Sequence, residues 1–344
     1  MQAGSERVVL SWPHKDRARR PRAPRVLTKF KRFDRRGARS VAAALPADNL
    51  LVKGDNLQVL AALKKRFAGR VKLIYIDPPY NTGGPKTAFR YNDSFSHAAW
   101  LTFMRSRLEL AKLFLAKEGA IYVHLDYHEV HYCKVLLDEI FGRDNFQREI
   151  IWRIGWISGY KTAGKNWIRN HDTLLFYARD KKYLDFNKKH IPYPRGYVRR
   201  DGKKPTGQGY PYEDTWNCSE LDPLNSVAIV SFSKEKVGGF KGQKNEALLR
   251  RIIEAHTREG EIVMDFFSGS GTTAAAAHKL RRQWISIEQL DGPLGKQVAR
   301  LQKTVAGDRV GISRAVGWKG GGSFVCCRLT EANNISYPKR TKIK

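Results

Sequence analysis

The sequence has few acidic residues, few cysteines and no long run of apolar residues. It contains 33 Asp and Glu against 63 Lys and Arg, so its formal net charge is +30 at pH 7. Because such an excess attracts phosphate backbones, we expect a nucleic acid as the partner. No apolar stretch is long enough to cross a bilayer and no signal-peptide pattern is present, so we expect no membrane partner. The four cysteines lack the CxxC spacing of metal sites, which indicates free thiols in a reducing compartment.

From about residue 45 onward, short apolar segments alternate with segments of helical periodicity. The expected strands lie at 50–53, 73–76, 120–125, 146–154, 173–178, 262–266, 284–287 and 323–329. The expected helices lie at about 57–67, 97–116, 129–141 and 292–305, and another begins near residue 273. This alternation predicts an α/β protein with a doubly wound, mostly parallel sheet.

Three segments lack this pattern. Residues 1–44 are rich in arginine and interrupted by prolines, so we expect an extended or disordered basic arm. This arm would either tether DNA non-specifically or form a loosely packed leader. Residues 331–344 are expected to form a basic tail, which is expected to be disordered at 339–344. From about 155 to 239 the periodicity fails, apart from a strand near 173–178, which predicts an irregular insertion between a first half at 45–154 and a second half at 240–330.

The irregular insertion contains candidate DNA-binding side chains. Guanidinium and ammonium groups can meet phosphates or guanine edges, and tyrosine rings can stack on bases. The candidates are Arg195, Arg199, Arg200, Lys203, Lys204 and Tyr197, with Tyr193 close by. The alternative is a solvated loop whose charges bind nothing specific.

The segment LIYIDPPY at residues 73–80 is a short apolar strand that ends in a carboxylate, two prolines and an aromatic ring. Pro78 and Pro79 cannot donate to a strand ladder, so the strand must end there. Asp77 and Tyr80 are then held at the carboxyl end of a strand, where open α/β sheets bind ligands. One acceptor beside one ring suits a planar group with an exocyclic amine, such as a nucleobase. The same residues can also be a simple exit from a strand into a turn.

The segment IVMDFFSGSGTT at residues 262–273 is a second strand that runs into a glycine-bearing turn and a helix. Gly269 and Gly271 would let backbone N–H groups approach a ligand at the positive end of that helix. The next strand ends in Glu288, where folds of the nucleotide-binding type commonly hold a ribose diol. Lysine does not follow the last glycine, which argues against a triphosphate ligand. A tight turn without a ligand is the alternative.

Together the two segments resemble those of the DNA amino-methyltransferases, which move a methyl group from S-adenosylmethionine to adenine N6 or cytosine N4. The DPPY tetrapeptide at 77–80 is similar to their catalytic motif, and DFFSGSG at 265–271 is similar to their cofactor loop. The order of the motifs resembles the β class of that family. Segments 96–100 and 317–325 further resemble the modification subunits of Type III restriction systems. This resemblance implies a circularly permuted, Rossmann-like methyltransferase fold in which the 155–239 insertion recognises the target.

The resemblance also implies roles for individual residues. The catalytic residues would be Asp77, Pro78, Pro79 and Tyr80, which hold and stack an extruded base. The cofactor-binding residues would be Asp265, Phe266, Ser268, Gly269, Gly271, Thr272, Glu288, Lys244 and Asp55. The family has proline after the lysine, whereas this chain has Asn245, so the contact made by that loop is open. S-adenosylmethionine would be the cofactor and double-stranded DNA the partner, and a homodimer and a restriction subunit are further candidate partners.

Several alternatives stay open at this point. Adenine N6 is the favoured target, because many cytosine-N4 members carry Ser at the first motif position, but cytosine N4 is a rival. RNA or protein-glutamine methylation and a non-catalytic basic DNA-binding protein on this scaffold are others. His124, Asp126, His128 and His131 resemble a metal cluster, but methyl transfer needs no metal, so we expect hydrogen-bonded structural roles and no metal. The expected location is the cytoplasm of a bacterium or archaeon, associated with the nucleoid.

Overall fold

The computed structural model describes residues 8–16, 25–83, 93–153, 165–216, 235–238, 240 and 242–331. Its strands are β1 (Arg25–Asp34), β2 (Gly37–Ser40), β3 (Asn49–Lys53), β4 (Val71–Ile76), β5 (Leu115–Leu125), β6 (Phe146–Arg153), β7 (His171–Ala178), β8 (His190–Ile191), β9 (Tyr210–Pro211), β10 (Thr215–Trp216), β11 (Ile262–Asp265), β12 (Gln283–Glu288) and β13 (Phe324–Glu331). Its helices are α1 (Asn56–Phe67), α2 (His97–Phe114), α3 (Val130–Phe141), the short 3₁₀ helix η1 (Arg143–Asn145), α5 (Glu246–His256), α6 (Thr272–Lys279) and α7 (Asp291–Ala306).

The centre of the molecule is an 11-stranded sheet in the order β10-β6-β7-β5-β4-β11-β12-β3-β13-β1-β2. The middle strands, from β5 through β4, β11, β12 and β3 to β13, pair in parallel. The flanking pairs β5–β7, β7–β6, β13–β1 and β1–β2 are antiparallel. The predicted doubly wound, mostly parallel α/β fold is therefore confirmed.

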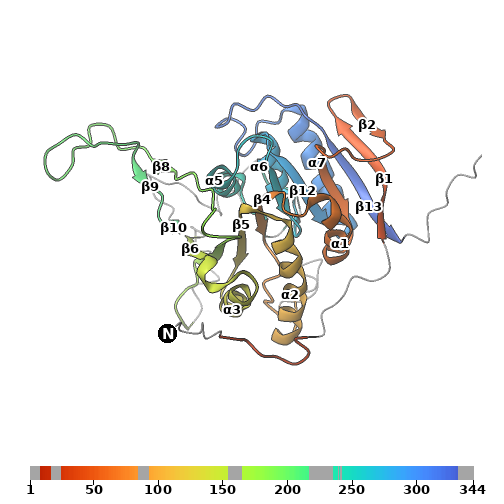
Figure 1. Cartoon of the computed structure of the whole chain (residues 1–344). Coiled ribbons are helices and arrows are strands. Elements are labelled where there is room, and N and C mark those ends of the chain that lie inside the picture. Colours follow the sequence, from red (N-terminus) through yellow and green to blue (C-terminus); the bar gives the residue numbers. More distant parts are fainter. Residues whose placement is uncertain are drawn as a thin grey trace, which may run out of the picture.

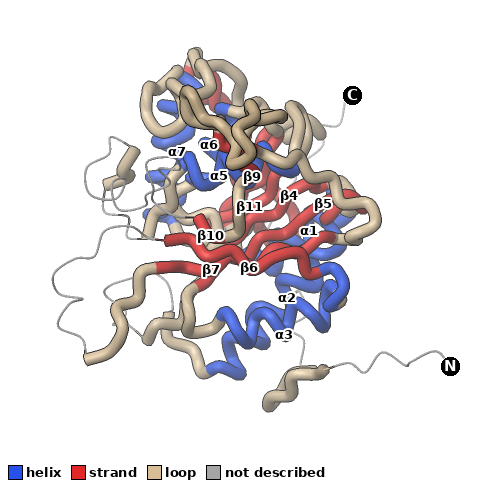
Figure 2. Tube along the Cα trace, turned by 90° about the vertical axis from the view of Figure 1, so that its left-hand side faces the viewer, coloured by secondary structure: helices blue, strands red, loops and turns tan. Residues whose placement is uncertain are grey.

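Helices cover both faces of this sheet (Figures 1 and 2). Along each middle strand alternate side chains point to opposite faces. In β3, Leu50 and Val52 pack into the core with α1, α2 and α3, whereas Leu51 packs into the core with α5, α6 and α7. Because both faces are covered, these strands are continuous apolar runs, which is why the sequence shows them clearly.

The sheet joins the two halves of the chain through β4 and β11, which are parallel neighbours although they lie far apart in the sequence. Their carboxyl ends carry the two motifs, since β4 is followed by Asp77 and β11 ends at Asp265. The prediction that the sheet is assembled from both ends of the sequence is confirmed. The two motifs therefore meet at one edge of the sheet.

Residues 1–44 were expected to form an extended or disordered arm, but most of the described part of this segment packs against the body of the protein. Arg25–Ser40 forms the β1–β2 hairpin, and β1 pairs with β13 at the edge of the main sheet. Phe33 in β1 stacks on Phe324 in β13 with their centroids 4.8 Å apart. Residues 8–16 also lie on the helical layer, where the Trp12 indole donates to Thr102 Oγ1 at 2.9 Å. Residues 1–7 and 17–24, and the expected tail beyond β13, lie outside the described residues.

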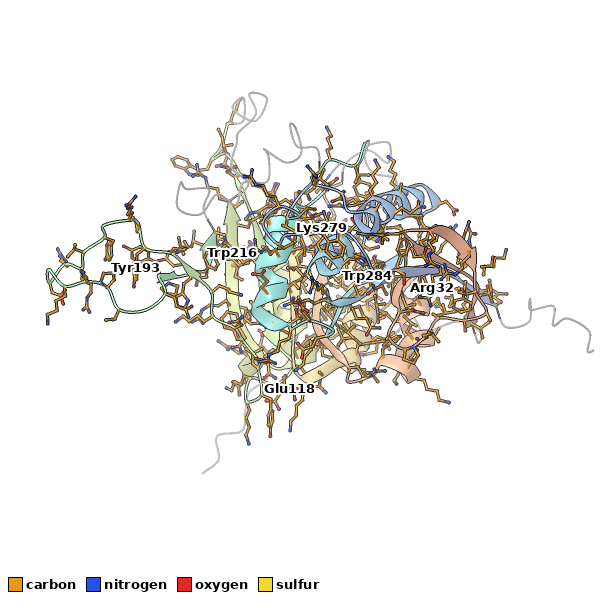
Figure 3. All side chains as sticks on the ribbon, turned by 90° about the horizontal axis from the view of Figure 1, so that it is seen from above. Arg32, Glu118, Tyr193, Trp216, Lys279 and Trp284 are labelled. Carbon is orange, nitrogen blue, oxygen red and sulfur yellow. The ribbon has the colours of Figure 1, made fainter. Side chains whose placement is uncertain are left out.

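The expected insertion is divided between the sheet and a projecting arm. Strand β7 lies between β5 and β6 in the main sheet, so this part of the 155–239 region belongs to the α/β body. The small β8–β9 sheet and the loop between its strands form an arm, residues 190–211, that extends away from this body (Figures 1 and 3). The chain then returns to the body, where β10 pairs with β6.

Candidate functional site

A cavity of about 500 Å³ lies at the carboxyl ends of β4, β11 and β12. It contains the catalytic candidates and most of the cofactor candidates. The predicted residues among its lining are Asp77, Pro78, Pro79, Tyr80, Lys244, Asp265, Phe266, Ser268, Gly269, Thr272 and Glu288. Residues from the two halves of the sequence thus share one cavity, of a size usual for small-molecule sites.

Asp77 has two carboxylate oxygens in different states. Its Oδ2 accepts a hydrogen bond from the Lys244 ammonium at 2.8 Å. Its Oδ1 is buried and receives no hydrogen bond from any residue that the structure describes. Because a buried acceptor without a partner costs free energy, Oδ1 is suited to accept a hydrogen bond from a ligand that enters the cavity.

Tyr80 is half-buried, and its hydroxyl donates to Asp172 Oδ2 at 3.4 Å. The Lys244 ammonium lies 5.2 Å from the centroid of the tyrosine ring. Burial, followed by the charges of Asp172 and Asp77, raises the pKa of Tyr80 well above its usual value, so the hydroxyl remains protonated. The backbone next to Tyr80 is also held, because the fully buried Trp100 donates its indole N–H to the Pro79 carbonyl at 2.8 Å.

Asp265 begins the loop between β11 and α6, and its carboxylate braces that loop. Its oxygens accept from the Phe267 N–H at 2.9 Å and from the Thr273 hydroxyl at 2.6 Å. Burial raises the pKa of Asp265 to about 7. Gly269 and Gly271 have φ of +48° and +76°, in the left-handed region that glycine adopts without strain. The loop therefore depends on glycine at these positions.

Glu288 is the last residue of β12, and its side chain is largely buried at the cavity wall. Burial raises the pKa of Glu288, and hydrogen bonds from backbone N–H groups, including that of Leu290 at 2.9 Å, partly oppose this rise. An acidic side chain at this strand end can accept hydrogen bonds from ligand hydroxyl groups.

Two of the predicted cofactor residues lie outside the cavity wall. Asp55 caps α1 through the Gln58 N–H and pairs with the Arg107 guanidinium at 3.1 Å, so its carboxylate has structural partners. The residues on either side of it, Gly54 and Asn56, line the cavity instead. Gly271 lies in the turn before α6, where its N–H donates to the Ser268 carbonyl at 2.7 Å. The structure gives no support to a contact between Asp55 and a ligand in this cavity.

The predicted DNA-binding residues all lie on the β8–β9 arm, apart from the cavity. The ring of Tyr197 stacks on that of Tyr193, with centroids 5.1 Å apart and planes 5° apart, so one of its faces is covered within the arm. Tyr210 meets both rings edge-on. The five basic candidates remain exposed; they are Arg195, Arg199, Arg200, Lys203 and Lys204.

Of the four residues considered as a metal cluster, His124, Asp126 and His128 have hydrogen-bond partners, whereas His131 is exposed. His124 contacts Asp172 and Tyr75, and His128 contacts Asp126 at 2.9 Å. In the described ranges no group of three or more His, Cys, Asp or Glu residues could hold a metal ion. No helix in this part of the chain is both long and apolar enough to cross a membrane.

Sequence reasoning missed Asp172 as a neighbour of Tyr80, because only the pairing of β5 with β7 brings it there.

The fold and the site define a doubly wound α/β protein with a ligand cavity at the carboxyl edge of its sheet. Residues 71–292 match the family model of the N6/N4 methyltransferases, described as DNA methylase, and the chain belongs to this family. The predicted membership in the DNA amino-methyltransferases is thereby confirmed.

Curated relatives include modification subunits of type III restriction-modification enzymes and a Type II methyltransferase. The chain is 33% identical to the probable type III restriction-modification enzyme HindVI Mod subunit of Haemophilus influenzae, over 91% of this chain and 59% of that protein. It is 29% identical to the Type II methyltransferase M.EcaI of Enterobacter cloacae, over 76% of this chain and 71% of that protein. A solved structure, the M1.HpyAVI-SAM complex, is 20% identical with a TM-score of 0.48 and covers 73% of this chain and 99% of its own. The chain thus spans about three fifths of the length of the HindVI subunit.

Proposed function

We propose that this chain methylates adenine N6 in duplex DNA with S-adenosylmethionine as the methyl donor. The observation that carries the proposal is the Asp77 carboxylate, which lines the cavity with one oxygen bound by Lys244 and the other buried without a partner. An acceptor of this kind suits the N–H of an exocyclic amine. It is next to the cofactor-type loop because β4 and β11 are neighbours. Membership in the DNA methylase family supports DNA over RNA and protein substrates.

The cavity residues fit S-adenosylmethionine, which would supply an electrophilic methyl group on its sulfonium. Glu288 would accept hydrogen bonds from the ribose hydroxyls, and the loop at Gly269 would offer backbone N–H groups. A Cβ at Gly269 would lie 3.2 Å from the Phe240 ring, so the loop is closely covered on that side. Asp265 would lie toward the methionine end of the ligand.

Asp77 would act on the base by orienting its amine. The lone pair of the adenine amine is delocalised into the ring, so the amine is a weak nucleophile. If Asp77 Oδ1 accepts one N–H, the lone pair is directed out of the ring plane, and Asp77 is also placed to take the proton that the nitrogen loses. Lys244 fixes the carboxylate by holding Oδ2, and Tyr80 would stack on the extruded base. Asp at this position favours adenine over cytosine.

The β8–β9 arm is the part of the insertion that we propose contacts the DNA backbone. Its tyrosine rings stack on one another, whereas its basic side chains are exposed. Exposed cations on a projecting arm suit phosphates, which carry no sequence information by themselves. The base of the arm is anchored to the body, since the Asn187 N–H donates to the Ala255 carbonyl at 2.7 Å.

Further partners follow from the relatives and stay proposals. The HindVI and EcoP15I proteins are named as Mod subunits of type III restriction-modification enzymes, so we include a restriction subunit as a partner of this chain. We also include a homodimer. The corresponding location is the cytoplasm of a bacterial or archaeal cell, at the nucleoid.

Transfer of label from methyl-labelled S-adenosylmethionine to unmethylated duplex DNA tests the proposal. The wild-type chain should label DNA, and Asp77→Ala should abolish labelling while DNA binding is kept. Glu288→Ala should weaken cofactor binding, whereas Tyr80→Ala should leave it intact. Asp144→Ala, which removes an exposed carboxylate remote from the cavity, is the matched control and should behave as wild type.

Three outcomes would contradict the proposal. Label in RNA but not in DNA would exclude the substrate, and full activity of Asp77→Ala would exclude the assigned role. DNA binding without transfer under any condition would favour a non-catalytic DNA-binding protein. Mass spectrometry of the digested nucleosides would separate N6-methyladenine from N4-methylcytosine, which is the alternative product.

A further inference from the structure

A buried polar network lies behind the ring of Tyr80 and is supplied by β4, β5 and β7. Asp172 Oδ2 accepts from the Tyr80 hydroxyl at 3.4 Å and from His124 Nε2 at 3.2 Å. On its other side His124 Nδ1 lies 2.7 Å from the Tyr75 hydroxyl. The Arg169 guanidinium forms an ion pair with the second oxygen of Asp172. The motif tyrosine is thus connected to residues that play no part in the proposed chemistry.

The protonation states in this network are consistent with one pattern of donors. Burial lowers the pKa of His124, so this imidazole is neutral and carries one N–H. Although burial raises the pKa of Asp172, the hydrogen bond from His124 and nearby positive charges lower it to about 2. An ionised Asp172 accepts from both His124 and Tyr80, and the other nitrogen of His124 accepts from Tyr75. Every contact in this pattern has one donor and one acceptor.

The position of Asp172 matters because the backbone at Tyr80 is already fixed. Pro79 has restricted dihedral angles, and its carbonyl is held by Trp100. The remaining freedom of Tyr80 is the rotation of its side chain. A bond at the far end of the ring, from the hydroxyl to a buried carboxylate, restricts the direction and plane of the ring. The ring plane is the feature that determines whether Tyr80 can stack on a base.

We propose that Asp172 is a positioning residue, which orients Tyr80 for stacking through the Tyr80 hydroxyl and is itself held by His124. This inference rests on the proposed function, since it concerns how the base is held for methyl transfer. His124 is fully buried and Asp172 nearly so, so both act through Tyr80 and not by touching the substrate. Charged acceptors make the stronger class of hydrogen bond, which suits a residue that must hold an orientation.

A double-mutant cycle on methyl transfer tests this role. Asp172→Ala and Tyr80→Phe should each lower kcat about 10-fold, as expected for a lost hydrogen bond to a charged group. The double variant should be no slower than either single variant, since both remove the same contact. The KM for S-adenosylmethionine should change less than about two-fold, because cofactor residues are untouched. Asp172→Asn should recover most of kcat, since its amide oxygen still accepts from the hydroxyl.

The chain offers a matched control in Asp138, whose Oδ1 accepts from the Tyr177 hydroxyl at 2.6 Å, away from the cavity. Asp138→Ala should lower stability and leave kcat unchanged. Full activity of Tyr80→Phe, multiplicative losses in the double variant, or an equal loss of kcat in Asp138→Ala would overturn the inference. All three of these outcomes are measured against an active wild-type chain. An inert wild-type chain would instead overturn the proposed function on which the inference rests, so the two failures are distinguishable.

Discussion

Replacement of Gly271 by alanine is the sharpest test of how the cofactor loop is built. Gly271 has φ of +76° and immediately precedes α6. A Cβ at this position would lie 2.5 Å from Cγ and 2.9 Å from Nε2 of Gln297. Gln297 is fully buried and bridges two hydroxyls, since its Oε1 accepts from Ser268 and its Nε2 donates to Ser286. Alanine therefore displaces the side chain that braces Ser268 in the cofactor loop.

The expected cost combines two effects. A non-glycine residue in the left-handed region costs about 1 kcal/mol. Overpacking a close-packed site by one methyl group costs about 1–3 kcal/mol more. Gly271→Ala should therefore lower the free energy of unfolding by about 2–4 kcal/mol. Gly69→Ala is the matched control, because Gly69 has φ of +69° but nothing lies within 4 Å of its Cβ position, so only about 1 kcal/mol should be lost.

Two measurements separate the effect of backbone strain at residue 271 from the effect of displacing the Gln297 side chain. Urea unfolding of both variants gives the difference in stability, and calorimetric titration with S-adenosylhomocysteine gives the affinity of the cavity. Gly271→Ala should weaken binding at least about 10-fold, as for a loss of about 1.4 kcal/mol, while Gly69→Ala should leave it unchanged. Equal destabilisation of the two variants, with unchanged affinity in both, would refute the role assigned to the contact with Gln297.

Two further predictions concern charge. The pKa of Asp265 is about 7 in the fold against 3.8 in the unfolded chain, so the folded state binds more protons between these values and stability falls as pH rises from about 4 to about 7. Asp265→Asn should flatten this dependence in urea unfolding and recover up to about 4 kcal/mol at pH 8; an unchanged pH profile would contradict the assigned pKa. In the arm, replacement of Arg199, Lys203 and Lys204 together by alanine should lower the slope of log K against log salt for DNA binding by up to about 3. An unchanged slope would show that these side chains do not contact phosphates.

Local sequence signals determined the central strands and the two motifs. Strands such as β4, β11 and β12 are buried on both faces, so each is an uninterrupted apolar run that can be recognised without knowing its neighbours. Prolines at 78 and 79 and the glycines of the cofactor loop then mark where the strands end. Because the carboxyl ends of parallel strands share one edge, the meeting of Asp77 with the cofactor loop could be predicted from the motifs.

Only the tertiary structure decided the contacts between residues far apart in the chain. The Lys244–Asp77 ion pair and the Asp172–Tyr80 hydrogen bond join positions 167 and 92 residues apart, and local periodicity contains no information about them. Residues 1–44 looked disordered because the segment is rich in arginine and interrupted by prolines, but the free edge of β13 supplies the backbone hydrogen bonds that order β1. Composition reports what a segment can bury by itself, whereas a pairing partner elsewhere in the chain decides whether it is ordered.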